Sequence, residues 1–257
     1  MTAAKPDSQL EDIRREIDDI DDGLMALLAR RFAASARVRA TKKIEGSLTS
    51  SPLRPAREAQ MLRRLLASRA GEFSPELLVR LWRVILSAST QAQAAVTIHL
   101  DADLAANIDL RVMIAEHFCG MAVEVHDHVA SSLGSLERRT GDLTIVTLTS
   151  PWADWLSQSL GKGVSVIGTL PIVATGNAPK LLVLGHAEAL PSGDDETIIL
   201  SKNPPPSELA PNRWQARSGD WHVTSVAGFM MADETARAGT GSFVGGRCPT
   251  PPRLIHE

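Results

Sequence analysis

Residues 9–45 read QLEDIRREIDDIDDGLMALLARRFAASARVRATKKIE, and this stretch decides the fold of the first part of the chain. It contains no proline, which would break a helix, and Gly23 is its one glycine. Its apolar residues recur at alternating steps of three and four, which is the spacing of a heptad seam: Leu10, Ile13, Ile17, Ile20, Leu24 and Leu27. A pattern longer than about 25 residues is typical of a coiled-coil-like helix. We therefore expect one long helix here.

The seam is interrupted by a charge. The step after Leu27 falls on Arg31, and a charge within an apolar seam is costly unless it is paired. Two explanations stay open, a snorkelling or register-setting arginine and an arginine that binds a small anion. Lys42 follows 11 residues later, about 16 Å along the axis and within about 20° of the same direction. Arg14 is roughly 25 Å from Arg31, so only an antiparallel partner helix would bring it to the same ligand.

Two shorter helices and then an α/β pattern follow. After a Ser- and Pro-rich loop at 46–55, helices are expected over about 55–68 and from Ser74 and Pro75 to about residue 95. Beyond that point, short apolar runs alternate with helix-length stretches, as in an α/β domain with a largely parallel sheet. The predicted organisation is a helical domain at 1–95 and an α/β extension at 96–257. A tail rich in Gly, Thr, Ser and Pro is expected to be flexible from about residue 238.

The charge is unevenly distributed along the chain. The formal net charge of −3 does not indicate a nucleic-acid or membrane-surface binder. Residues 1–95 carry 16 Lys and Arg against 12 Asp and Glu (net +4), and residues 96–257 carry 11 against 18 (net −7). All seven histidines lie beyond residue 95, and the chain has no tyrosine. Chemistry in the first part therefore has arginine as its abundant functional group, and no His base, Tyr acid or Cys nucleophile.

The cysteines and the N-terminal residues indicate the cellular compartment of the protein. Cys119 and Cys248 are too few for a disulfide framework, and we expect both thiols to be buried and inert. The first residues are polar, without an apolar stretch behind a basic start, so no secretory signal is predicted. No run approaches the roughly 18 apolar residues of a membrane helix. The expectation is a cytoplasmic protein without a membrane partner.

Two polar pairs lie on the shorter helices. Arg57 and Glu58 open the second helix, and Ser89 and Gln93 are four residues apart on one face of the third. Each pair alone is typical of a solvated helix face.

Together with the long helix, these pairs carry a resemblance. The segments LEDIRREIDDIDDGLMALLARRFAASARVRATKK, RPAREAQMLRRL and LVRLWRVILSASTQAQ resemble the all-helical chorismate mutase family, in order and spacing, over residues 8–95. The resemblance implies a multi-domain protein whose N-terminal part is an all-α three-helix fold in an intertwined homodimer with two composite active sites. It implies that Arg14 comes from the partner subunit and that one chain supplies the rest of the substrate-binding set: Arg31, Lys42, Arg57, Glu58, Ser89 and Gln93.

The implied reaction is the rearrangement of chorismate to prephenate, in the shikimate pathway to phenylalanine and tyrosine. It needs no metal or other cofactor, and arginines suit a dianionic substrate. Lys42 and Gln93 would stabilise the ether oxygen of the transition state, with Arg31 binding the substrate and Glu58 its hydroxyl group. Arg54 occupies a position that is often acidic in the family, and the effect of this departure is left open.

The α/β part resembles another group of proteins more loosely. The runs GDLTIVTL and VSVIGTLPI are similar to the periplasmic-binding-like lobes of prephenate dehydratases, and SGDDETIILS and WHVTSVAGF to their regulatory domain. The Thr-Arg-Phe and Glu-Ser-Arg-Pro motifs of those enzymes are missing, so a degenerate or regulatory domain is expected. The alternatives are a bifunctional mutase–dehydratase, an isochorismate pyruvate-lyase, and a non-catalytic dimeric protein that senses a ligand such as an aromatic amino acid.

For three further motifs, the sequence favours a structural role over a binding site. His126-Asp127-His128 has the look of a metal-binding pair, but no further ligands stand out in the sequence, so no metal site is predicted. The glycines at 239–246 follow no strand-then-helix unit, which argues against a dinucleotide loop. Trp152 and Trp155 are expected in the core.

Overall fold

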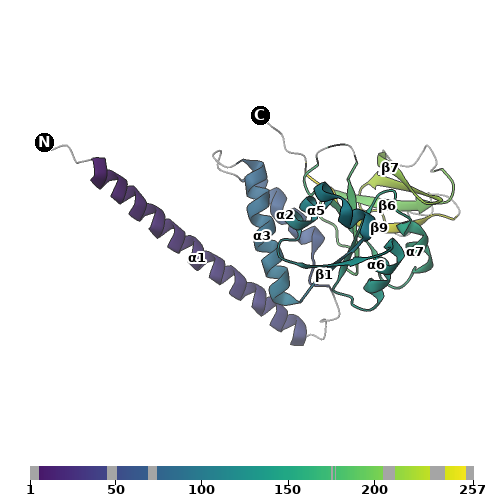
Figure 1. Ribbon diagram of the computed structural model, residues 1–257, viewed down its shortest axis with the longest axis horizontal. Coiled ribbons are helices and arrows are strands. Elements are labelled where there is room, and N and C mark those ends of the chain that lie inside the picture. Colours follow the sequence, from purple (N-terminus) through teal and green to yellow (C-terminus); the bar gives the residue numbers. More distant parts are fainter. Residues whose placement is uncertain are drawn as a thin grey trace. The chain divides into compact units, whose positions relative to one another are not determined.

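The structure is a computed structural model, and it describes residues 6–44, 51–68, 74–174, 176, 178–204, 212–231 and 241–252 (Figure 1). The contacts divide the chain into two compact units, Met1–Ser47 and Leu48–Glu257.

The first unit is a single helix, α1 (Pro6–Ile44), of 39 residues. It confirms the long helix expected over residues 9–45. At 1.5 Å per residue it is about 58 Å long. The six apolar residues from Leu10 to Leu27 that form the predicted seam are 47% to 58% exposed. An apolar stripe of this length is typical of a helix that packs against a partner.

The second unit begins with two helices, α2 (Pro55–Ala67) and α3 (Pro75–Gln93). The side chain of Ser74 accepts a hydrogen bond from Leu77 N at 3.1 Å, and Pro75 occupies the first helical position. This confirms the start predicted for the third helix, because a capped backbone N–H and a proline are what a helix N-terminus favours.

The remaining elements of this unit alternate between strand and helix as far as β4. They are β1 (Thr97–Asp101), α4 (Ala102–Ala106), α5 (Ile108–His117), β2 (Ala122–His126), α6 (Val129–Gly134), a 3₁₀ turn (Ser135–Glu137), β3 (Leu143–Thr147), α7 (Trp152–Gln158), β4 (Ser165–Leu170), β5 (Leu181–Gly185), β6 (Asp195–Ser201), β7 (Asn212–Ser218), β8 (Trp221–Ala227) and β9 (Phe243–Pro249). The nine strands form one sheet in the order β2-β1-β3-β5-β4-β9-β6-β8-β7.

The sheet is mixed, so the expectation of a largely parallel sheet was wrong. Three of the eight neighbouring pairs are parallel (β1–β2, β1–β3 and β4–β9), and five are antiparallel. The cause is the short connections in the second half of the chain. β7 and β8, for example, are joined by Gly219 and Asp220, and Gly219 has a φ of +58°. A two-residue hairpin of this kind makes an antiparallel pair, whereas a parallel pair needs a long crossover.

Both faces of the central strands of the sheet are covered, whereas the edge strand β2 is exposed. One core contains Leu133, Trp152 and Leu156 from α6 and α7, with Val146 and Leu182 from the strands. The other contains residues of α4 and α5 with the alternate strand positions: Leu104, Ile114, Phe118, Ile145, Leu181 and Val183. Successive strand residues therefore enter opposite cores, as the pleat requires. Trp152 is fully buried and Trp155 packs against the first core, which confirms their predicted place.

The last strand corrects the prediction of a flexible tail from about residue 238. Phe243–Pro249 forms β9 in the interior of the sheet, between β4 and β6. Its glycines are needed there, since a Cβ on Gly246 would clash with the backbone of Val166 on β4. These glycines, which are typical of a loop, instead allow β9 to approach β4 closely.

The two thiols differ. Cys248 on β9 is fully buried, and burial, followed by the charge of Glu196, raises its pKa well above the ordinary value. This agrees with the expectation of an inert thiol. Cys119 is half-buried, so the expectation that both would be buried was wrong for this residue.

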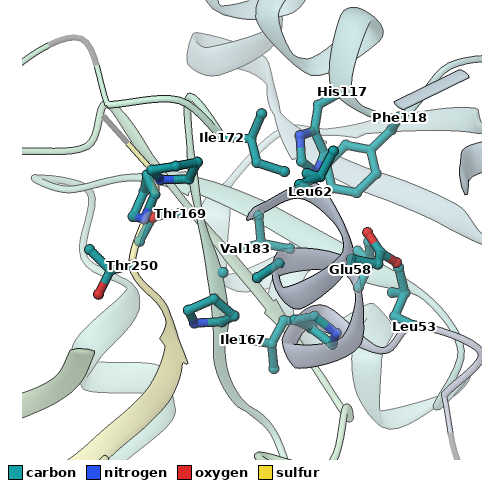
Figure 2. A pocket seen from close by; sticks show the side chains of 17 residues that line it. Leu53, Glu58, Leu62, His117, Phe118, Ile167, Thr169, Ile172, Val183 and Thr250 are labelled. Carbon is teal, nitrogen blue, oxygen red and sulfur yellow. The ribbon is translucent and has the colours of Figure 1, made fainter. Parts of the chain in front are cut away.

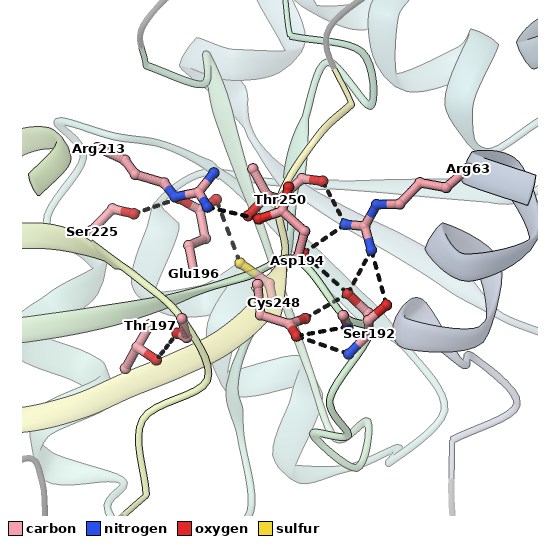
Figure 3. Close-up of polar contacts among 12 residues, drawn as sticks. Arg63, Ser192, Asp194, Glu196, Thr197, Arg213, Ser225, Cys248 and Thr250 are labelled. Carbon is pink, nitrogen blue, oxygen red and sulfur yellow. Dashed lines mark hydrogen bonds and ion pairs between the residues drawn. The ribbon is translucent and has the colours of Figure 1, made fainter. Parts of the chain in front are cut away.

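Arg63 fastens α2 to the rest of the second unit (Figure 3). Its Nη1 donates to the backbone carbonyl and the hydroxyl of Ser192, both at 3.0 Å. Its Nη2 donates to the carbonyls of Asp194 at 2.6 Å and Thr250 at 2.9 Å. Hydrogen bonds from a charged donor are among the stronger ones in proteins. The Arg63 side chain therefore holds α2 to Ser192 and Asp194, which precede β6, and to Thr250, which follows β9.

We expect Arg63→Ala to lower the free energy of unfolding by about 2–3 kcal/mol, because four carbonyl and hydroxyl acceptors lose a charged donor. The matched control is Arg64→Ala, which removes an exposed arginine from the same helix and is expected to change stability by less than about 0.5 kcal/mol. Urea unfolding followed by circular dichroism measures both. Equal effects of the two substitutions would contradict an anchoring role for Arg63.

Candidate functional site

The residues predicted to bind chorismate lie on α1 in the first unit and on α2 and α3 in the second. On α1, Arg14 is exposed and pairs with Glu11 at 2.7 Å, one turn away. Exposed pairs of this kind contribute little, so Arg14 is easily recruited by another anion. Arg31 is half-buried and lies beside Arg30 and Arg37 in a hollow of the helix surface. Lys42 belongs to α1, but its side chain lies outside the described residues.

In the second unit, half-buried Glu58 forms an ion pair with buried Arg83. Its Oε2 accepts a hydrogen bond from Nη1 of Arg83 at 2.7 Å, and the two side chains are 15% and 4% exposed. The Arg83 guanidinium also donates to the carbonyl of His117 through Nε at 3.1 Å and Nη2 at 3.0 Å. Arg83 thus joins three helices, because Glu58 lies on α2, Arg83 on α3, and His117 at the end of α5.

Arg83 is the residue that the sequence analysis missed. It lies on the buried face of α3, four residues after Val79 and three before Leu86, both of which are buried. A charge in an apolar helical stripe is the same signal that singled out Arg31. That signal was present here also, but nothing in the sequence indicates that Glu58 is the partner.

The predicted pair on α3 is brought together by the helix backbone. The hydroxyl of Ser89 is buried and donates to the Ile85 carbonyl at 2.7 Å. Nε2 of Gln93 donates to the Ser89 carbonyl at 3.2 Å. Nε2 of a glutamine carries two hydrogens. A second donor of Gln93 therefore remains for a substrate, as far as the described contacts go.

Two arginines lie at the start of α2, and of these Arg57 is exposed and Arg54 is half-buried. Arg54, which precedes the helix, approaches Glu188 with its Nη1 3.9 Å from Oε2. At this distance and exposure the contact is weak.

A pocket opens between α2 and the sheet, next to Glu58 (Figure 2). Its walls are mostly apolar, with Leu53, Leu62, Phe118, Ile167, Ile172 and Val183 among the lining residues. Three buried polar atoms on its lining have no hydrogen-bond partner among the described residues: Nδ1 of His117, Oγ1 of Thr169 and Oγ1 of Thr250. Buried polar atoms are rarely left unpaired, so the pocket is suited to a molecule with an apolar body and polar groups.

The histidine of this pocket is held neutral. Burial, and then the positive charge of Arg83, lower the pKa of His117 well below its ordinary value of 6.5. Its imidazole is therefore uncharged at neutral pH and has one N–H donor and one acceptor nitrogen.

This lowered pKa predicts how stability depends on pH. Below about pH 6.5, the unfolded chain binds a proton at His117 while the folded chain does not, so lowering the pH favours unfolding. Protonation of His117 in the unfolded chain lowers the free energy of unfolding by at most about 1.4 kcal/mol per pH unit. His117→Gln removes this pH dependence, so the difference in free energy of unfolding between wild type and variant shrinks from pH 7 to pH 5. His128→Gln, at an exposed position, serves as the control. Stability curves that stay parallel for wild type and His117→Gln would refute the assignment.

Comparison with known proteins gives one family assignment. The family model of chorismate mutase type II matches residues 13–94. No curated protein matches the chain. A solved structure titled "GqqA- a novel type of quorum quenching acylases" is 11% identical, with a TM-score of 0.44, over 60% of this chain and 95% of that chain. A similarity this weak supports no conclusion here.

The family match covers α2, α3 and most of α1, and it agrees with the resemblance seen in the sequence. Residues 13–94 of the chain are thus similar to the chorismate mutase type II family.

Proposed function

We propose that the protein is a chorismate mutase, an isomerase that rearranges chorismate to prephenate in phenylalanine and tyrosine biosynthesis. The observation that carries the proposal is the family match, because residues 13–94 include every residue of the predicted site: Arg14, Arg31, Lys42, Arg57, Glu58, Ser89 and Gln93. No helix in the described part of the chain is both long and apolar enough to cross a membrane. We place the protein in the cytoplasm.

The active form in this proposal is a homodimer. The exposed apolar stripe of α1 supports it, because a second copy of the same helix offers a matching stripe. In an antiparallel pair whose two-fold axis passes near residues 22 and 23, midway between positions 14 and 31, Arg14 of one subunit lies beside Arg31 of the other. Each site is then composite, with Arg14 supplied in trans.

The chemistry in this proposal is positioning and electrostatic stabilisation. Arg14, Arg31 and Arg57 bind the two carboxylates and hold the substrate in its chair-like form, with the help of Ser89. Lys42 and the second hydrogen on Nε2 of Gln93 stabilise the negative charge that develops on the ether oxygen as its bond breaks. Oε1 of Glu58 accepts the substrate hydroxyl while Oε2 stays with Arg83. None of these steps requires a cofactor.

Turnover of chorismate by the purified full chain tests the proposal. We expect prephenate as the sole product, and Gln93→Ala is expected to lower kcat/KM by about 100- to 1,000-fold, the effect of losing one donor to a developing oxyanion. Gln91→Ala is the matched control, because Gln91 is exposed and its amide donates to the Cys119 carbonyl. We expect it to keep wild-type activity. Absence of turnover in the wild type would reject the mutase. Phenylpyruvate, or pyruvate with salicylate from isochorismate, would favour the dehydratase or lyase instead.

Mixing two inactive variants tests the shared site. Arg14→Ala and Arg31→Ala chains are each expected to be inactive as homodimers. Random mixing makes half of the dimers mixed, and each mixed dimer has one intact site of two, so about a quarter of wild-type activity is expected to return. As a reference, Arg31→Ala chains are mixed with Arg15→Ala chains. Arg15 is an exposed neighbour of Arg14 on α1, and its substitution leaves both Arg14 and Arg31 of that chain in place. No recovery above the homodimers would rule out Arg14 in trans.

A second candidate function, regulation by a small molecule, is favoured by the pocket beside Glu58. Its apolar walls and three unpaired polar atoms suit an aromatic amino acid. Since Glu58 is one of the lining residues, an occupant would contact the proposed mutase site directly.

We expect millimolar phenylalanine or tyrosine to raise the Tm and to change the rate of chorismate turnover. Thr169→Val is expected to abolish both responses, because it removes a hydroxyl from the pocket lining. Thr224→Val is a matched control, since Thr224 is also buried with an unpaired hydroxyl but lies on β8, away from the pocket. No response of the wild-type Tm to phenylalanine, tyrosine or tryptophan would exclude this function.

A further inference from the structure

A cluster of two histidines and a glutamate lies at the edge of the sheet, outside the proposed mutase site and the pocket, and it includes His126, for which the sequence predicted no metal site. β1 and β2 are parallel neighbours, and their register aligns His99 with Glu124. His126 follows Glu124 by two residues, so the pleat places both on the same face of β2. One ligand-type atom of each residue lies within 4.8 Å of the others. The histidine that follows in the sequence, His128, is not part of this cluster; it is exposed and precedes α6.

The distances within the cluster fit a metal ion. Nδ1 of His99 and Nε2 of His126 are 2.9 Å apart. The carboxylate oxygens of Glu124 are 3.8 Å from the first nitrogen and 3.6 Å from the second. These two distances are too long for hydrogen bonds. Ligands held at 2.0–2.1 Å around tetrahedral zinc are about 3.3 Å from one another, and the three observed separations bracket that value.

A buried carboxylate orients the inner histidine. Oδ2 of Asp142 is 3.1 Å from Nε2 of His99, and Oδ1 accepts a hydrogen bond from Thr97 N at 3.0 Å. Asp142 and His99 are both buried. An ionised carboxylate only accepts, so Nε2 of His99 carries the proton and Nδ1 directs its lone pair toward His126 and Glu124. A carboxylate behind a histidine is the usual support of a metal-ligating imidazole.

The site is open on one side. The side chains of His99 and His126 are 4% and 11% exposed, whereas that of Glu124 is 58% exposed. An ion therefore has a route past Glu124 to two imidazoles that are screened from water. Two neutral nitrogens and one carboxylate make a ligand set with a single net negative charge, which suits a divalent ion of borderline softness.

We propose that His99, Glu124 and His126 bind one zinc ion, through Nδ1, a carboxylate oxygen and Nε2, with the fourth position open to water or an anion. Two histidines and a glutamate are a ligand set of open zinc sites, in which three protein groups leave one position for exchangeable ligands. In the absence of metal, the 2.9 Å contact between the rings is a hydrogen bond. The site is independent of the proposed mutase activity, since none of its residues belongs to the match at 13–94.

Metal binding by the purified full chain tests the proposal. After treatment with a chelator, we expect titration calorimetry to give one zinc ion per chain, and cobalt to give the visible absorption bands of a tetrahedral site. Asp142→Asn is expected to weaken zinc binding by about 10- to 100-fold, because the supporting carboxylate is lost. Glu124→Ala and His126→Ala each remove one of three ligands, and we expect both to abolish stoichiometric binding.

The controls separate loss of a ligand from loss of the fold. Glu124 is exposed, so its replacement by alanine is expected to leave the circular dichroism spectrum and the metal-free Tm unchanged. His128→Ala removes a nearby exposed histidine and is expected to keep wild-type zinc affinity and the cobalt bands. The proposal is overturned if the wild type binds no stoichiometric zinc. It is also overturned if Glu124→Ala binds zinc as tightly as the wild type does, or if His128→Ala loses binding.

Discussion

The buried charge of Arg83 is the constraint on which the arrangement of the second unit depends. A guanidinium that is almost fully removed from water must have its charge and its donors satisfied nearby. Its partners are the Glu58 carboxylate on α2 and the His117 carbonyl at the end of α5. Apolar packing tolerates small rotations of a helix, whereas these bonds require particular atoms at particular places. Two helices of the mutase type II segment and the first long helix of the α/β region are therefore fixed relative to one another.

The same constraint links structure to the proposed chemistry. Glu58 belongs to the predicted substrate-binding set, yet its carboxylate already holds Arg83 and lines the pocket with His117. Arg63, five residues further along α2, donates to Ser192 and Asp194 just before β6 and to Thr250 just after β9. The α/β region therefore supports the helix that carries Glu58. The sequence pattern changes near residue 95, whereas the contacts divide the chain between Ser47 and Leu48. The bonds from Arg83 to the His117 carbonyl and from Arg63 to Ser192, Asp194 and Thr250 join α2 and α3 to the α/β region.

The parts of the fold that depend on local patterns were predictable. The heptad spacing over 9–45 predicted α1, and the Ser74-Pro75 start predicted α3. The short apolar runs and helix-length stretches beyond residue 95 predicted the alternation of strands and helices that follows α3. β9 was missed because its glycines, which resemble loop residues, are needed for its approach to β4. That requirement arises only when two segments about 80 residues apart are adjacent, and a local pattern contains no such information.

The candidate sites show the same limit. Arg57, Glu58, Ser89 and Gln93 were found through residue types at fixed spacing on helices, because neighbours on a helix are three or four residues apart. Glu58 and Arg83 are 25 residues apart, and His99 and Glu124 are also 25 apart, so no helical spacing relates either pair. The sequence drew attention to His126 and His128, which are close in the chain, whereas strand register aligns His99 with Glu124, and the His126 side chain two residues further on contacts His99. A strand places residues i and i+2 on one face, but the adjacent strand, whose position is set by the whole sheet, decides what that face meets. Ligands that come from two strands are therefore recognised only after the register is known.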